Sequence, residues 1–170
     1  MQKTKTAIAF PLLILVLCVF QGCYSFSGSS IPAYLKTIAV PVFEDRSGAG
    51  IAQYRGELTG GIARKIESGS LLRTTPSMAS ADALLDGVII SYTDLPSQLS
   101  SKTERAVTNR ITIVVEVSME DRVKNEKVFF QTFIGFADYP VGNYAAQQQA
   151  IRLSINQIID DIFDRIVSGW

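Results

Sequence analysis

The junction Phe20-Gln21-Gly22-Cys23 divides the sequence into two parts of different character. Before the junction, Lys3 and Lys5 are followed by a run from Ala7 to Phe20 that carries no charge. Such a run is too short for a spanning helix, which needs about 20 apolar residues, and its positive start is typical of an export signal. The sequence therefore predicts a signal peptide over residues 1–22 and a mature chain that begins at Cys23.

The residues around this junction resemble a lipobox, the bacterial motif at which a cysteine is acylated and the signal peptide is removed. Gly22 fits the pattern, whereas Phe20 and Gln21 stand where Leu and then Ala or Ser are usual. The alternative is an ordinary cysteine near a cleavage site. We expect Cys23 to be the lipid-attachment site, because two or more acyl chains hold a protein to a membrane without a transmembrane helix. Tyr24, in place of the Asp that marks inner-membrane retention, predicts the periplasmic face of the outer membrane.

The composition of the mature chain narrows its function. Removing residues 1–22 from 170 leaves 148 residues, which suits one domain with its own core. Two of the 16 Lys and Arg residues are lost with the signal, so 14 remain against 16 Asp and Glu, and no basic footprint for nucleic acid is expected. Cys18 lies in the signal, so acylation of Cys23 would leave no thiol for a disulfide or a metal.

The chain also lacks the residues of common catalytic sites. It contains no histidine, which excludes His-based triads, most zinc sites and the commonest general base. The stretch from Gly56 to Gly61 has the glycine spacing of a phosphate-binding loop, but Ile62-Ala63 follows in place of Lys and Ser or Thr. Paired carboxylates are best interpreted as solvated charge. We predict a protein that is not an enzyme and that holds no metal or cofactor.

Hydrophobic periodicity predicts the elements of the mature domain. Helical spacing predicts helices over 51–68 and from Asn143, the expected N-cap, toward the C-terminus. Pro41 should lie at a sheet edge or a strand end, because it cannot donate to a ladder. A polar loop is expected over 94–109. Alternation predicts strands over 36–43, 82–93, 110–121 and 127–136, with a further short candidate at 71–75.

The resulting order, β-α-β-β-β-α, predicts an α+β domain over 36–170, preceded by a lipidated tether over 23–35. Its fold would be a two-layer sandwich with two helices packed on one face of a mainly antiparallel four-stranded sheet. In the last strand, Phe129 and Phe133 are expected on the face away from the helices, either covered by loops or the tether or forming a surface for lipid or a partner. The opposite set is Val128, Phe130, Ile134 and Phe136.

Two segments resemble the LptE family, the lipoproteins of lipopolysaccharide assembly. They are Cys23–Pro32 (CYSFSGSSIP) and Lys36–Phe43 (KTIAVPVF), and the likeness is nearest to forms from the Bacteroidetes and Chlorobi. The rest of the chain agrees in pattern rather than in motif. The resemblance implies a plug seated inside the LptD barrel of the outer membrane, where the pair passes lipopolysaccharide to the cell surface. It also implies that the polar sheet face and the loops meet the barrel wall or the ligand.

Of the site residues, only Cys23 can be matched to the family position by position. Because lipid A carries phosphates, basic side chains near the barrel mouth are reasonable ligand contacts. Lys102, Arg105 and Arg110 form the nearest approach to a basic group, and we predict them as contacts to the phosphates of lipopolysaccharide. The alternative is solvated surface charge, the usual fate of such residues.

Other functions remain open at this point. The stretch Lys36–Gly48 also resembles the first strand of CsgG-like and LpoB-like lipoproteins, which would make the protein a secretion-pore subunit or an activator of cell-wall synthesis. A CsgG-like domain would be expected to be longer than this chain. A third possibility is a periplasmic lipoprotein that holds a small apolar ligand between its helices and its sheet.

Overall fold

The structure is a computed structural model that describes residues 31–50, 52–99, 101 and 106–170. The signal peptide, Cys23 and the first part of the tether lie outside these residues. The helices are α2 (Ala52–Gly69) and α3 (Tyr144–Ser168). The strands are β1 (Thr37–Ala39), β2 (Glu44–Asp45), β3 (Arg73–Thr74), β4 (Ala83–Leu99), β5 (Ala106–Asp121) and β6 (Glu126–Pro140).

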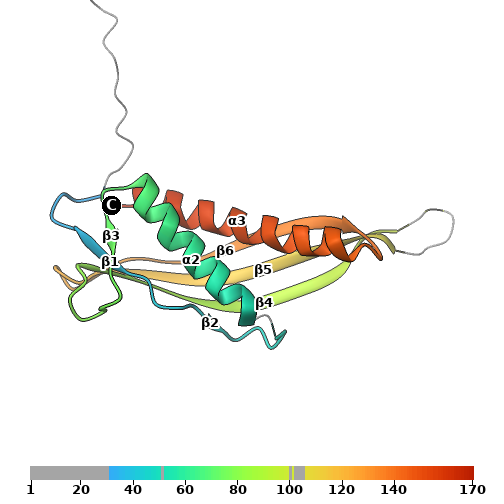
Figure 1. The fold of residues 1–170 in the computed structure, drawn as a ribbon, viewed down its shortest axis with the longest axis horizontal. Coiled ribbons are helices and arrows are strands. Elements are labelled where there is room, and N and C mark those ends of the chain that lie inside the picture. The colour runs from blue at the N-terminus through green and yellow to red at the C-terminus, as the bar shows by residue number, and fades with distance from the viewer. Residues whose placement is uncertain (1–30, 51, 100, 102–105) are drawn as a thin grey trace, which may run out of the picture.

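All six strands of the described residues belong to one sheet, in the order β3-β1-β4-β5-β6, with β2 also paired to β4. The three long strands form an antiparallel meander, whereas the short strands β1, β2 and β3 pair in parallel. The predicted α+β class is confirmed (Figure 1). The sheet has six strands rather than four, because residues 73–74 and 44–45 each add a short strand.

Both helices cover the same face of this sheet. Helix α3 runs along β5 and β6, and α2 packs beside it over the edge of the sheet where the short strands β2 and β3 lie (Figure 1). Lys65 of α2 and Asp160 of α3 form an ion pair of 2.7 Å across the helix boundary. The predicted apolar stripes are buried between the layers, chiefly Leu58, Ile62, Ile66, Ile151, Ile155, Ile158, Ile162 and Ile166.

The start of α3 agrees with the prediction, whereas β1 ends earlier than predicted. Asn143 is the N-cap of α3, as predicted, and its Oδ1 accepts a hydrogen bond of 3.0 Å from the backbone N of Ala146. Strand β1 ends at Ala39, two residues before Pro41, so the predicted strand over 36–43 is shorter than expected. Phe43 is instead buried beneath the helices, and its backbone N donates to the Thr59 hydroxyl of α2.

The long strands extend beyond the predicted ones. β4 continues to Leu99 and β5 already begins at Ala106, so the prediction of a loop over 94–109 is wrong. Their pairing reaches as far as Leu99 and Ala106. Beyond its base, where Asp94 is hydrogen-bonded to Gln147 of α3, this part of the hairpin is not packed against the helices, and its sequence therefore lacks the apolar alternation that would have indicated strands.

The predicted facing of β6 is also wrong. Phe129 and Phe133 are buried against the helix layer, whereas Phe130, Ile134 and Phe136 are exposed on the other side. The reason is the close crossing of α3 over β6. A Cβ atom added to Gly135 would lie 2.0 Å from the carbonyl oxygen of Ser154, so only glycine fits at the centre of the crossing. The covered side therefore has fewer bulky apolar residues than the uncovered one, and counting them selects the wrong face.

Candidate functional site

The outward side of the β5–β6 pair forms the candidate functional surface. We call it the open face, because the described helices all lie on the other side of the sheet (Figure 1). Direct cross-strand pairs set its layout, among them Thr112 with Phe136 and Val114 with Ile134. It consists of Arg110, Thr112, Val114, Glu116 and Ser118 on β5 and Phe130, Thr132, Ile134, Phe136 and Asp138 on β6.

An apolar patch lies within this face. Its members are Val114, Phe130, Ile134 and Phe136, and the three residues of β6 are 61%, 51% and 47% exposed. These side chains contribute little to the core, since the opposite side of the same strands supplies it. Exposed aromatic and branched side chains grouped on one sheet face are typical of an interaction surface.

Two cations lie over the aromatic rings of the patch. The Arg110 guanidinium is 4.8 Å from the centroid of the Phe136 ring, and the Lys127 ammonium is 5.7 Å from that of Phe130. Such cation–π pairs keep a positive charge next to an apolar surface. The open face is therefore amphipathic, and it can meet a partner that offers both apolar and polar groups.

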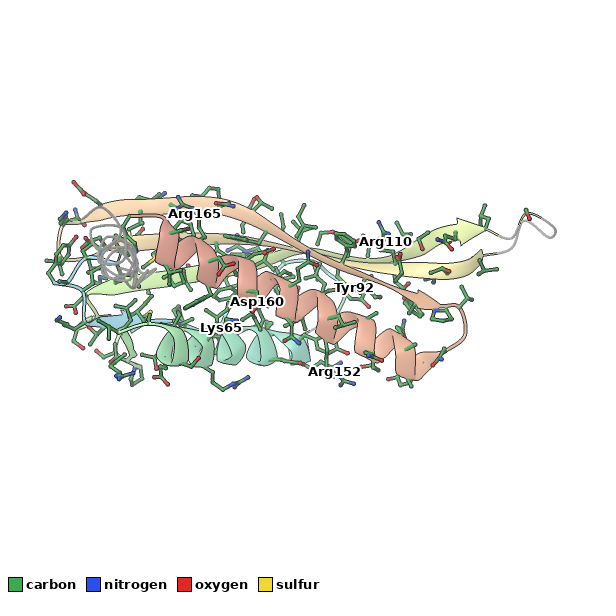
Figure 2. The ribbon with its side chains drawn as sticks, turned by 90° about the horizontal axis from the view of Figure 1, so that it is seen from above. Lys65, Tyr92, Arg110, Arg152, Asp160 and Arg165 are labelled. Carbon is green, nitrogen blue, oxygen red and sulfur yellow. The ribbon has the colours of Figure 1, made fainter. Side chains whose placement is uncertain are left out.

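Arg110 is the one predicted phosphate contact that lies within the described residues. Its Nε and one terminal nitrogen donate to the two carboxylate oxygens of Asp138, at 2.7 and 2.9 Å. Figure 2 shows Arg110 on the long sheet. This hydrogen bonding raises the pKa of Arg110 and lowers the pKa of Asp138. Arg110 is thus paired within the domain, and an anionic ligand would have to replace Asp138. Lys102 and Arg105 lie outside the described residues.

The β4–β5 hairpin extends past the rest of the molecule as an arm. The pairing of β5 with β6 ends at Thr108 and Pro140, whereas that with β4 continues to Leu99 (Figure 2). Leu95, Leu99 and Val107 are exposed on the arm. In the sequence, Lys102 and Arg105 lie between Leu99, the last residue of β4, and Ala106, the first residue of β5.

A network of polar side chains joins the base of the arm to α3. The Asp94 carboxylate accepts hydrogen bonds from Tyr139 Oη at 2.6 Å, Gln147 Nε2 at 2.7 Å and Asn109 Nδ2 at 3.1 Å. Burial, and then the hydrogen bond to Asp94, raise the pKa of Tyr139, so this phenol stays a donor at neutral pH. Burial is also the main reason that the pKa of Tyr92 rises to about 12. The network links three strands to a helix and fixes the direction of the arm.

Sequence reasoning missed this network because it placed Asp94 and Asn109 in a loop. The signal that could have found it is the continuation of the alternation in β5. Asp94 is the partner of the buried Ile111, and it therefore points to the covered side of the sheet. A polar residue in that position needs hydrogen-bond partners, which α3 and β6 supply.

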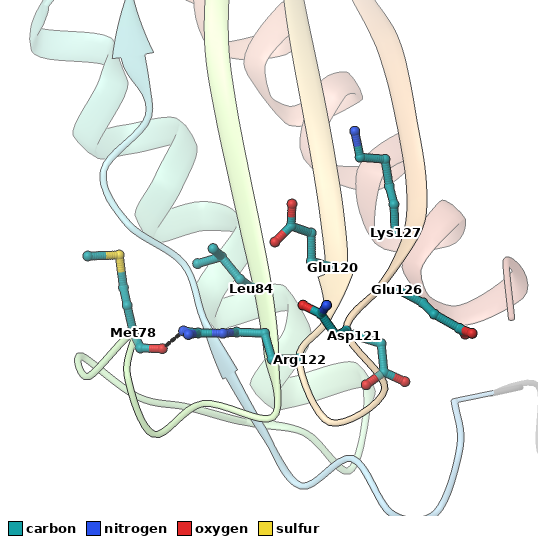
Figure 3. Close-up of a pocket in the computed structure, with 8 residues that line it drawn as sticks. Met78, Leu84, Glu120, Asp121, Arg122, Glu126 and Lys127 are labelled. Carbon is teal, nitrogen blue, oxygen red and sulfur yellow. Dashed lines mark hydrogen bonds between the residues drawn. The ribbon is translucent and has the colours of Figure 1, made fainter.

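At the other end of the meander, residues of the β5–β6 turn line a polar pocket of about 610 Å³ (Figure 3). Arg122 donates to the carbonyl oxygen of Met78, and the Asp121 carboxylate accepts from the backbone N atoms of Val123 and Lys124. These groups stabilise the turn and are occupied in doing so. Within residues 31–50, 52–99, 101 and 106–170, no cluster of His, Cys, Asp and Glu is arranged to hold a metal ion.

No helix among the described residues combines the length and the apolarity needed to cross a membrane.

Comparison with solved structures shows where this fold occurs. A hypothetical protein from Chlamydia trachomatis superposes with a TM-score of 0.56 at 12% identity, covering 79% of this chain and 97% of that one. The uncharacterized lipoprotein B from Nitrosomonas europaea gives a TM-score of 0.56 at 11% identity, covering 79% and 83%. A protein from Xanthomonas campestris gives 0.56 at 12% identity, covering 78% and 84%. At these identities the likeness concerns the fold.

A search of curated protein sequences returns no match. The family model of LptE, described as lipopolysaccharide-assembly, matches residues 35–168. This match includes every strand and both helices of the structure. It favours the LptE resemblance over the CsgG-like and LpoB-like alternatives. The chain belongs to the LptE family of lipopolysaccharide-assembly lipoproteins.

Proposed function

We propose that this protein is the lipid-anchored partner of an LptD-like barrel at the periplasmic face of the outer membrane, and that it acts by binding and scaffolding rather than by catalysis. Cys23 carries the lipid. The observation that carries the proposal is the apolar patch of the open face, where Phe130, Ile134 and Phe136 stay exposed although the domain core is complete without them. In this proposal the patch packs against the barrel wall.

The connection between β4 and β5 contains two of the predicted phosphate contacts. In the sequence, Lys102 and Arg105 belong to the connection between β4 and β5, and we assign them the phosphates of lipopolysaccharide. Arg110 lies nearer the body of the domain and is paired with Asp138. Its role is to hold the Phe136 ring, and it contacts a phosphate only if the ligand replaces the carboxylate.

The barrel contact can be tested by affinity purification from detergent-solubilised envelopes. We expect the tagged protein to retain one large β-barrel through washing. A Phe136→Asp variant should lose this partner, because it introduces a charge into the patch. Leu153→Asp is the matched control, since Leu153 is 53% exposed on α3 and lies away from the open face. Equal barrel recovery with both variants, each shown by circular dichroism to be folded, would contradict the proposal.

Lipopolysaccharide binding is tested separately, with lipid A that carries or lacks its phosphates. The double variant Lys102→Ser, Arg105→Ser should bind phosphorylated lipid A at least tenfold more weakly, while binding of the dephosphorylated form should not change. The control removes two exposed cations far from the arm, Lys124 in the β5–β6 turn and Arg64 on α2. If both double variants bind alike, the arm does not recognise phosphate.

A further inference from the structure

An apolar pocket of about 740 Å³ opens at the end of the domain where the described chain begins. It lies between the first described residues, the C-terminal end of α2 and the last turns of α3. Its volume falls within the range of small-molecule sites, about 300–1,000 Å³. The side chains that the argument uses are Ile31, Leu35, Lys36, Leu71, Phe163 and Val167.

One wall of this pocket is strongly exposed. Leu71 is 88% exposed, more than any other large hydrophobic residue in the described part of the chain. It nevertheless lines the same pocket as Phe163 and Val167. Leu35, on the inner side, is buried in the core. The pocket thus continues the hydrophobic core to the surface and ends in an uncovered leucine, which is typical of a place that something apolar covers.

The polar groups of the pocket do not require a polar ligand. The Ser70 hydroxyl donates to the carbonyl oxygen of Ile66 at 2.7 Å, and the Ser68 hydroxyl donates to that of Lys65 at 3.2 Å. Both hydroxyl donors are therefore used within the helix end. Hydrocarbon can enter such a pocket without leaving a donor unsatisfied.

Among the described residues that line the pocket, Lys36 alone carries a charge. A lysine can lay its methylene stem along apolar surface and keep its ammonium group at a polar boundary. At a bilayer surface that boundary contains the phosphates of the lipid headgroups. Hydrocarbon walls with one cation at the rim match an acyl chain that ends in an anionic headgroup.

The short distance along the chain between the pocket and Cys23 indicates that the lipids of the anchoring bilayer can reach the pocket. Ile31 follows Cys23 by eight positions, so the acylated cysteine lies within about 28 Å of the pocket even if the chain is fully extended. The C-terminus lies at this same end, and the arm extends from the opposite end (Figures 1 and 2). Anchoring at Cys23, which is part of the function proposed above, therefore keeps the pocket within reach of the bilayer surface.

We propose that this pocket takes one acyl chain of a glycerophospholipid of the anchoring bilayer, with Lys36 at the headgroup phosphate. The domain then docks on the membrane by this end as well as through its tether. The arm consequently extends away from that surface, in a direction that the eight-residue connection alone would leave free.

Trp170 provides the probe, because it is the only tryptophan in the chain. It follows the pocket-lining Val167 by three residues, and its indole Nε1 donates to the carbonyl oxygen of Ile166 at 2.7 Å. The mature acylated protein is reconstituted into phosphatidylethanolamine–phosphatidylglycerol vesicles, with and without brominated acyl chains. We expect the brominated lipid to quench Trp170 fluorescence at least twofold. Leu71→Asp should abolish most of this quenching, and the Leu153→Asp control should leave it unchanged.

The outcomes separate this proposal from the function on which it rests. Mass spectrometry of the purified protein shows whether Cys23 is acylated, and an unacylated protein would overturn the anchor itself. Acylated protein whose Trp170 is not quenched, or is quenched equally in the Leu71→Asp variant, would overturn only the pocket proposal. If one of the acyl chains of Cys23 fills the pocket instead, Trp170 emission differs between the acylated protein and a Cys23→Ser variant but brominated lipid does not quench it. That result would also overturn the proposal.

Discussion

The two sides of β5 differ sharply in burial and in chemistry. Toward the helices the strand presents Ile111, Ile113, Val115, Val117 and Met119, all fully buried. The residues between them, on the open face, are Arg110, Thr112, Val114, Glu116 and Ser118. The side that faces the helices is entirely apolar, because it forms part of the core. The other side is free to carry whatever a partner requires.

β6 shows that hydrophobicity alone does not distinguish these two sides. Its open side carries Phe130, Ile134 and Phe136, whereas the covered side includes Gly135 and Ala137 beneath α3. The covered side is limited by room, because a helix crosses it closely. The open side is not limited in this way. Its bulky residues are not needed for the core, and this indicates a role in binding.

The largest expected effect comes from removing one phenylalanine from each side of β6. Phe133→Ala should lower the free energy of unfolding by about 3–5 kcal/mol, because it empties a buried site. Phe136→Ala should lower it by about 1 kcal/mol or less, since only cross-strand contacts are lost. Urea denaturation of both variants measures the difference. Equal losses would mean that the open face also stabilises the fold, and the contrast between the two sides would fail.

A smaller effect is expected where the covered side has no room. Gly135→Ala should destabilise the domain by about 1–3 kcal/mol, because its Cβ would meet the backbone of Ser154 in α3. Gly56→Ala on α2 is the matched control. A Cβ added there meets no described atom within 4 Å, and the helix should gain about 0.5–1 kcal/mol. Thermal unfolding of the two variants should therefore shift in opposite directions, and a tolerated Gly135→Ala would show that the crossing is looser than described.

Where two layers meet, the sequence was a good guide. The isoleucine stripe of α3 and the alternation of β5 each bury their residues in the predicted way, since one face of a repeating element is apolar and the other polar. The same rule could not place the β6 side chains, because it counts apolar residues and is blind to the closeness of a crossing helix. Nor could it extend β4 and β5 into the arm, which beyond its base is not packed against the helices, so that no alternation is required.

The candidate site was less accessible to sequence reasoning than the fold. Arg110 could be identified as a cation near the long connection, but its partner Asp138 lies 28 residues away and is brought opposite it only by the β5–β6 register. The apolar pocket at the end where the described chain begins is built from three distant segments, and no local pattern in any of them indicates it. Cross-strand register and the meeting of chain ends are long-range properties, and a single sequence carries no direct record of them.

The smallest effect concerns this ion pair on the open face. The hydrogen bonds from Arg110 lower the pKa of Asp138 in the folded protein. A lowered carboxyl pKa contributes stability above the unfolded value of about 3.9, and this contribution is lost as the pH falls through the folded value. Because both side chains are exposed, the pair is screened by salt and the change in unfolding should be slight.

The sharper measurement is therefore the Asp138 pKa itself, from carboxyl carbon shifts in an NMR titration. In an Arg110→Ala variant the pKa should return toward its ordinary value, and in Arg110→Lys it should recover only in part, because lysine keeps the charge but cannot form the two parallel bonds. An unchanged pKa in Arg110→Ala would mean that Arg110 is not held by Asp138 in solution. Arg110 would then be free to bind phosphate, and the open face would be a basic surface as well as an apolar one.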